Sequence, residues 1–172
     1  MSLTDLSQVL QAGLLAMSAL EIIAVLLSAT AVWLTVRQNL LCWPLGLVSV
    51  LMYAWVFLDV KLYAVVLLER VYAVLQLYGW WQWARGGAQH SGRQVSRLPG
   101  SQLLLSLAIG AAGSLLLGYL MATHTDAAAP WLDAALTSFS LVAQVWMAQK
   151  RLECWPLWIA LDVIYVGLFL SK

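Results

Sequence analysis

Ionisable side chains inside long apolar runs are the residues of this sequence that could do chemistry. Glu69, Arg70 and Asp162 each stand within such a run. A charged group at the centre of a bilayer costs about 2.5–3.5 kcal/mol on insertion scales, so it usually faces a partner or a polar cavity. Asp162 is therefore either a counter-charge for a flat cationic ligand or a structural hydrogen-bonding group. Trp158, one helical turn earlier, could stack on the same cation, since indole is the best cation–π partner; the alternative is a lipid-facing or interfacial tryptophan.

A second set of candidates shares one face of a single predicted helix. Glu69, Tyr72, Gln76 and Trp80 follow one another at spacings of three or four residues. Gln76 suits an amide or hydroxyl of a ligand, and its alternative role is an interhelical hydrogen bond. Glu69 could line a cavity or serve a structural pair. These residues, with Trp158, Asp162 and Tyr53, form the predicted substrate-binding set.

Covalent chemistry is not indicated. The predicted spans hold no Ser-His-Asp set, no carboxylate pair at a cleft and no glycine-rich phosphate loop. The two cysteines and the loop histidines have no metal-ligand spacing. We therefore expect no catalytic residue, no metal and no cofactor, and the protein is predicted not to be an enzyme.

The composition is that of a membrane protein. Of the 172 residues, 63% are apolar and 10% are charged, whereas soluble domains carry about 25% charged residues. The apolar residues form runs of roughly 17–23 residues, the length that crosses the hydrocarbon layer. A net charge of +1 argues against a nucleic-acid partner. The predicted class is an all-α polytopic membrane protein whose surroundings are the lipid bilayer.

The apolar runs predict six spanning helices, separated by short polar breaks. Residues 1–19 are expected to be a polar lead-in and not a signal peptide, because no positive charge precedes the apolar stretch. Tryptophans near the helix ends, including Trp43, Trp80, Trp81 and Trp83, are expected in an interfacial aromatic belt. The predicted spans are residues 14–36, 41–58, 62–83, 102–121, 131–148 and 154–170.

The loop charges predict the orientation. With the N-terminus outside, most lysines and arginines fall in cytoplasmic loops, as the positive-inside rule requires. The segment at residues 84–100 is the longest polar stretch between spans and becomes a cytoplasmic loop. The inside residues are then Arg37, Arg85, Arg93, Arg97, Lys150 and Arg151, against Lys61 and Lys172 outside.

The phrase Cys-Trp-Pro-Leu occurs twice, beginning at Cys42 and at Cys154. A tyrosine, a phenylalanine and a leucine coincide further along both copies, which indicates an internal duplication. Four crossings separate the copies, so both run in the same direction, as in parallel-repeat transporters. Tyr53 and Tyr165 are mates in this repeat, so symmetry is an alternative explanation for Tyr53 as a site residue.

The duplication predicts the domain plan. A first three-helix bundle spans residues 20–83, a linker helix spans residues 101–122, and a second bundle spans residues 130–172 with only two helices. The expected plan is 3+1+3 with the last helix absent. A mate of the third helix would begin beyond Lys172, so we expect a truncated sequence, a gene fragment or a natural protein without that helix.

Two stretches resemble the PnuC-type vitamin transporters of bacteria. The first, "RQNLLCWPLGLVSVLMYAWVFLDVKLYAVVLLERVYAVLQLYGWWQW", is similar to their first half, with the pair Leu62-Tyr63 opening the third helix and Tyr-Gly-Trp-Trp-Gln-Trp ending it. The second, "RLECWPLWIALDVIYVGLF", is similar to their penultimate helix. The resemblance implies a SWEET-like fold, in which two parallel three-helix bundles are joined by a linker helix and enclose a cavity.

The resemblance also implies a function. It predicts facilitated transport (uniport) of nicotinamide riboside across the bacterial inner membrane, with a small, cationic vitamin as partner and a homo-oligomer left open. Nicotinamide riboside carriers of this family have Gln and Asn where this chain has Glu69 and Asp162. A thiamine transporter of the same family is therefore one alternative. The absent helix makes a non-transporting membrane binding or assembly subunit another.

Overall fold

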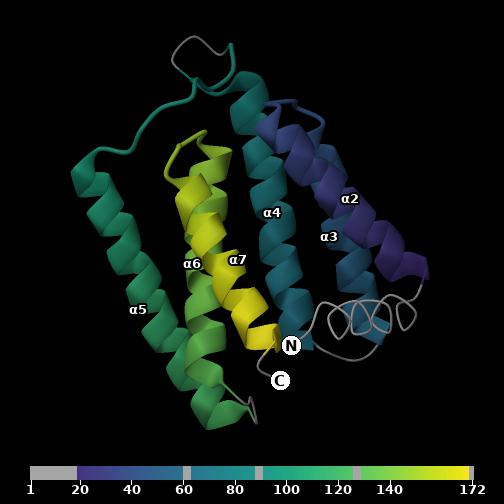
Figure 1. Ribbon diagram of the computed structural model, residues 1–172, viewed down its shortest axis with the longest axis vertical. Helices are drawn as coiled ribbons and strands as arrows, with labels where there is room; N and C mark the ends of the chain where they lie inside the picture. The colour runs from purple at the N-terminus through teal and green to yellow at the C-terminus, as the bar shows by residue number, and fades with distance from the viewer. Residues whose placement is uncertain (1–18, 60–62, 88–90, 126–128, 171–172) are drawn as a thin grey trace. The chain divides into compact units, whose positions relative to one another are not determined.

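The computed structural model describes residues 19–59, 63–87, 91–125 and 129–170, and these residues fold almost entirely into α-helices (Figure 1). The predicted all-helical class is confirmed: no strand occurs in the described ranges apart from one isolated bridge between Ser96 and Arg151. Residues 14–18 of the first predicted span lie outside the described ranges, and the described part of this helix begins at Ala19. The helices are α2 (Ala19–Val36), α3 (Cys42–Asp59), α4 (Tyr63–Arg85), α5 (Gly100–His124), α6 (Pro130–Ala148) and α7 (Cys154–Leu170).

Three of the described helices are long and apolar enough to cross a membrane. α2, α3 and α5 have mean hydropathy of 2.1, 1.5 and 2.0, and α7 is apolar over a shorter stretch. Large apolar side chains on these helices are exposed, among them Leu26, Leu104 and Val163. Exposed leucines and valines in such number suit a surface that meets lipid rather than water.

The chain divides into two compact units, Met1–Trp80 and Trp81–Lys172. In the first unit α2 packs along α3 (Figure 1). A buried polar contact joins them: the Ser49 hydroxyl, 1% exposed, donates to the Ala24 carbonyl at 2.9 Å and lies 2.7 Å from the Ser28 hydroxyl. Small side chains at Ala24, Ser28 and Ser49 let the two backbones approach closely.

A reciprocal pair of glycines joins α3 to α4 in the same unit. The Trp43 ring covers Gly79 so closely that a Cβ at position 79 would lie 2.1 Å from two ring atoms. One turn along each helix the roles reverse, and a Cβ at Gly46 would lie 2.7 Å from the Gln76 amide nitrogen. Trp43 is 1% exposed, so the expectation that it belongs to an exposed aromatic belt is wrong. Its ring is a packing element, and Gly79 is the space it needs.

In the second unit α5 packs along α6, and α6 packs against α7. Small residues of α5 receive large rings of α6: Gly110 lies against Phe139, and Gly118 lies against Trp131. This small-residue face explains how the two long helices approach closely. The α6–α7 contact is an apolar core of Leu136, Ala143 and Leu161, with Phe139, Leu157 and Trp158 packed around it.

The turn between α2 and α3 and the turn between α6 and α7 have the same backbone geometry. Gln38 and Lys150 occupy matching repeat positions, and their φ angles are 54° and 52°, in the left-handed region usually left to glycine. Each turn is a Schellman motif, in which main-chain N–H groups cap the preceding helix. The matching bonds run from Gln38 N–H to Thr35 O (3.0 Å), Lys150 N–H to Met147 O (3.0 Å), Asn39 N–H to Leu34 O (2.9 Å) and Arg151 N–H to Trp146 O (2.9 Å). This agreement supports the duplication inferred from the repeated phrase.

The segment before α5 is fastened to the α6–α7 turn. We call residues 93–98 the strap. Ser96 N–H donates to Lys150 O at 3.0 Å and Leu152 N–H donates to Ser96 O at 3.1 Å. The Glu153 carboxylate accepts from Leu98 N–H at 3.1 Å. The predicted polar loop therefore includes an ordered strap.

The end of α4 in this unit also differs from expectation. Trp83, expected in the aromatic belt, is 6% exposed. Its indole N–H donates to Met147 O at 3.2 Å, and the Lys150 ammonium lies 4.4 Å from its ring. Trp83 therefore fixes the end of α4 to the end of α6, while Trp81 remains 55% exposed.

Candidate functional site

The first unit gathers two acids around a tyrosine. Tyr53 of α3 is half-buried and stacks on Phe57, with ring centroids 6.2 Å apart. Glu69 of α4 and Glu21 of α2 lie close enough for their charges to act on the Tyr53 hydroxyl. Three different helices thus supply one acid–tyrosine cluster. Two of its members, Tyr53 and Glu69, belong to the predicted site, and Glu21 does not.

The second unit has a related arrangement, built from the two helices α6 and α7. Asp133 and Asp162 lie close enough for their charges to act on the Tyr165 hydroxyl. Tyr165 is the repeat mate of Tyr53, and Asp133 is the mate of Glu21. Asp162 is exposed in this structure, so its carboxylate is available to a ligand or a partner.

The Gln76 side chain fits against α3 because the residue opposite it, Gly46, has no side chain. The Gln76 side chain is half-buried and rests on Gly46. Any side chain at position 46 would displace the amide. Tyr72 lies one turn earlier on α4 and is also half-buried, so both predicted residues lie along the half-buried side of this helix.

The two predicted tryptophans have different surroundings. Trp158 packs on the α6–α7 core, and its indole nitrogen is buried with no hydrogen-bond partner in the described part of the chain. Trp80 is 38% exposed near the end of α4. Trp158 is therefore fixed by packing, with one donor unused, whereas Trp80 keeps a partly open ring.

Sequence reasoning missed three polar or small residues. Ser49 forms the buried hydroxyl contact described above, and Gly46 makes room for Gln76. Gln144 of α6 is 4% exposed, and its amide nitrogen has no hydrogen-bond partner in the described ranges. A glutamine inside an apolar span was the available signal for Gln144. The small residues gave none, because their role depends on which helix lies opposite.

The chemistry of these clusters is that of binding. They offer carboxylates, phenols and an amide, which accept hydrogen bonds and balance positive charge. Within the described ranges, no group of three or more His, Cys, Asp or Glu residues is placed to hold a metal. The arrangement suits a polar or cationic organic ligand.

A multi-helix membrane protein with two related polar clusters has the features of a transporter. The profile described as "Nicotinamide mononucleotide transporter" matches residues 18–172. The chain belongs to this family.

Curated relatives carry a related name. The chain is similar to the nicotinamide riboside transporter PnuC of Escherichia coli K12, with 26% identity over 149 residues that cover 72% of this chain and 62% of the relative. It is also similar to the nicotinamide riboside transporter PnuC of Neisseria mucosa, with 31% identity over 131 residues that cover 72% of this chain and 49% of the relative.

A solved structure has the same fold. The crystal structure of the vitamin B3 transporter PnuC matches with a TM-score of 0.68 at 28% identity, covering 87% of this chain and 66% of that one. The predicted membrane-transporter fold is confirmed. The chain spans less than two thirds of the length of each of these relatives.

Proposed function

We propose that this chain takes part in the facilitated transport of nicotinamide riboside across the bacterial inner membrane. The observation that carries the proposal is the joint match in sequence and fold to PnuC proteins named for this vitamin. Transport down a concentration gradient requires a binding site and a change of access, and it requires no nucleotide site. The acid–tyrosine clusters supply groups suited to such a ligand.

The proposal gives each site residue a role. In the second unit, Asp162 offers a counter-charge to the pyridinium ring. In the first unit, Glu69 offers a carboxylate of the same kind. Gln76 bonds the carboxamide or a ribose hydroxyl, with Tyr72 and Tyr53 as further hydroxyl partners. Trp158 and Trp80 offer ring faces to the flat base, since indole stabilises a cation by about 0.5–2 kcal/mol.

The proposal also includes the predicted topology, with the N-terminus outside. Arg93, Arg97 and Arg151 then lie on the cytoplasmic side, which follows from the positive-inside rule. The strap and the α6–α7 turn to which it is fastened would face the cytoplasm.

Thiamine is a second candidate because of the acids. Its thiazolium ring is also a flat cation, and Glu69 and Asp162 of this chain are acids that suit a cation. Two carboxylates favour a permanent cation of either kind, so the choice between the two vitamins is a matter for measurement.

The test is calorimetric titration of the purified chain with nicotinamide riboside, thiamine, riboflavin and uncharged nicotinamide. We expect nicotinamide riboside to bind most tightly and nicotinamide to bind at least tenfold more weakly, because it lacks the charge that Asp162 balances. If thiamine binds more tightly, thiamine takes the place of nicotinamide riboside as the proposed substrate. Equal binding of the charged and uncharged ligands would refute the counter-charge.

Flux separates transport from simple binding. Proteoliposomes holding the chain should take up labelled nicotinamide riboside until inside and outside concentrations are equal. Binding without uptake would instead indicate a non-transporting binding or assembly subunit, the alternative drawn from the sequence.

A further inference from the structure

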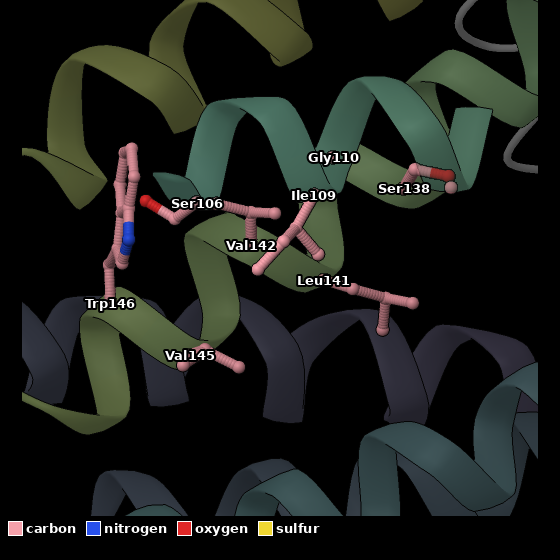
Figure 2. Close-up of a pocket in the computed structure, with 9 residues that line it drawn as sticks. Ser106, Ile109, Gly110, Ser138, Leu141, Val142, Val145 and Trp146 are labelled. Atoms are coloured by element: carbon pink, nitrogen blue, oxygen red, sulfur yellow. The ribbon is translucent and has the colours of Figure 1, made fainter. Parts of the chain in front are cut away.

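An apolar groove runs between α5 and α6 (Figure 2). Its volume is about 330 Å³, and it opens along one side. The hydroxyl of Ser106 is already bonded within α5, to the Gln102 carbonyl at 2.7 Å, so this residue presents little free polarity to the groove. The lining includes Ser106, Ile109, Gly113, Leu141, Val142 and Trp146.

The groove is unsuited to the vitamin. A small organic cation needs acceptors or aromatic faces, and a wall made mainly of aliphatic groups cannot replace its hydration. An aliphatic chain, in contrast, has no polar group to desolvate and gains by covering the apolar lining. The exposed leucines of the same helix, Leu104 and Leu105, are those of a surface that meets lipid.

Two arginines stand where the groove ends. Trp146 lines the groove, and its carbonyl accepts from Arg151 N–H at 2.9 Å. The Arg151 guanidinium then reaches the strap and donates from Nη1 to Ser96 Oγ and to Arg97 O, both at 2.9 Å. Arg97 itself is exposed. The two guanidinium-bearing residues are therefore adjacent at the strap, directly beyond the Trp146 end of the groove.

Arg151 is half-buried, and its two bonds to the strap both leave from Nη1. Its Nε is buried, so a headgroup would be bound by the outer nitrogens of the guanidinium. A guanidinium carries five N–H donors in a planar fork that matches a phosphate. The Glu153 carboxylate, which accepts from Leu98 N–H, lies at the same strap and opposes part of this positive charge.

We propose that this part of the second unit is a binding site for an anionic phospholipid, with the phosphate at Arg97 and Arg151 and one acyl chain in the α5–α6 groove. The site is separate from the acid–tyrosine clusters and independent of the vitamin. Its two halves, a basic end and an aliphatic channel, occur in the order in which a phospholipid presents its headgroup and chain.

The test is native mass spectrometry of the purified chain, titrated with phosphatidylglycerol or phosphatidylcholine. We expect phosphatidylglycerol to bind at least fivefold more tightly. Arg97→Gln should lower its affinity about fivefold, the equivalent of about 1 kcal/mol for one basic residue near a headgroup, and should leave phosphatidylcholine unchanged. Arg37→Gln is the matched control: it removes one charge in the first unit and should change neither affinity.

The groove is tested separately with Ser106→Leu, which fills its Ser106 end without removing a contact between helices. We expect both lipids to bind at least tenfold more weakly, which excluding two buried methylene groups would already produce. The melting temperature of each variant should match that of the parent chain, so that lost binding is not lost folding.

Four results would overturn the site. The two lipids could bind equally in the parent chain, or Ser106→Leu could leave both affinities unchanged. Inorganic phosphate alone could displace phosphatidylglycerol at equal concentration, in which case the acyl chain contributes nothing. A chain that dimerises through this groove, so that Ser106→Leu yields monomers with unaltered lipid binding, would assign the groove to a second copy instead.

Discussion

The contact between Trp43 and Gly79 gives a sharp prediction about stability. Replacing Gly79 by alanine adds one methyl group at a position where there is no free space for it. That methyl would lie 2.1 Å from two atoms of the Trp43 ring and 2.6 Å from a third. Normal carbon–carbon contacts are about 3.5–4.0 Å, so the ring or the helix must move by more than 1 Å. Trp43 is 1% exposed, and the ring has nowhere to go without disturbing its neighbours.

Two opposing effects set the magnitude. Alanine is favoured over glycine in a helix interior by about 1 kcal/mol. Overpacking a filled site costs about 1–3 kcal/mol, and more when the clashing group is a rigid ring. We expect a net loss of up to about 2 kcal/mol in the free energy of unfolding, and more if the rigid ring cannot move. Gly167 of α7 is the matched control, because a Cβ there meets no heavy atom within 4 Å. Gly167→Ala should therefore be neutral or stabilising.

The assay is equilibrium unfolding in mixed detergent micelles, followed by far-ultraviolet circular dichroism. A double-mutant cycle isolates the contact: in a Trp43→Ala background the same change at Gly79 should cost nothing, since the opposing ring is gone. Similar stabilities for Gly79→Ala and Gly167→Ala would refute the reasoning. An undiminished cost in the Trp43→Ala background would show that the clash lies elsewhere.

Further predictions concern ligand, packing and topology. Asp162→Asn should weaken binding of a cationic vitamin by roughly tenfold while leaving expression unchanged, as measured by calorimetry, because the neutral amide keeps the shape and loses the charge. Equal affinities of the Asp162→Asn variant and the parent chain for the cationic vitamin would show that Asp162 is not part of the site. Ser49→Ala should lower the stability of the chain by about 0.5–1.5 kcal/mol, through loss of its bonds to Ser28 and the α2 backbone; no loss in an unfolding titration would mean that the contact contributes nothing. A cysteine at exposed Val95 should be shielded from an impermeant thiol reagent in intact cells, and one at exposed Thr125 should react. The reverse labelling pattern would invert the proposed orientation.

The helices were accessible to prediction because each is a long apolar run between short polar breaks. The repeated Cys-Trp-Pro-Leu phrase also foretold a shared turn. Burial within the bundle was harder. Trp43 and Trp83 stand at helix ends, where a tryptophan serves equally well in an interfacial belt or in a helix contact. Only the residue opposite decides between them, namely Gly79 for Trp43 and the Met147 carbonyl for Trp83.

The candidate site shows the same division. Spacing along one helix related Glu69 to Gln76, and Trp158 to Asp162, because the helical period is fixed. The approach of Glu21 and Glu69 to Tyr53 depends on how three helices are rotated about their axes. Packing sets that rotation, and a single sequence does not reveal it. The predicted site does not include Glu21 for this reason.

The paired Schellman turns have a consequence for how the two copies could diverge. Their caps are bonds between main-chain atoms, so the reversal of the chain places little demand on the side chains that surround it. The side chains of the turn could therefore be substituted in one copy while the helical hairpin stays folded. In the first copy a side chain of the turn makes a local contact: the Asn39 carboxamide oxygen accepts from Leu41 N–H. In the second copy the turn residue Arg151 donates to Ser96, which lies more than fifty residues earlier in the chain. Because main-chain bonds stabilise the turn, its side chains can take on a different contact in each copy.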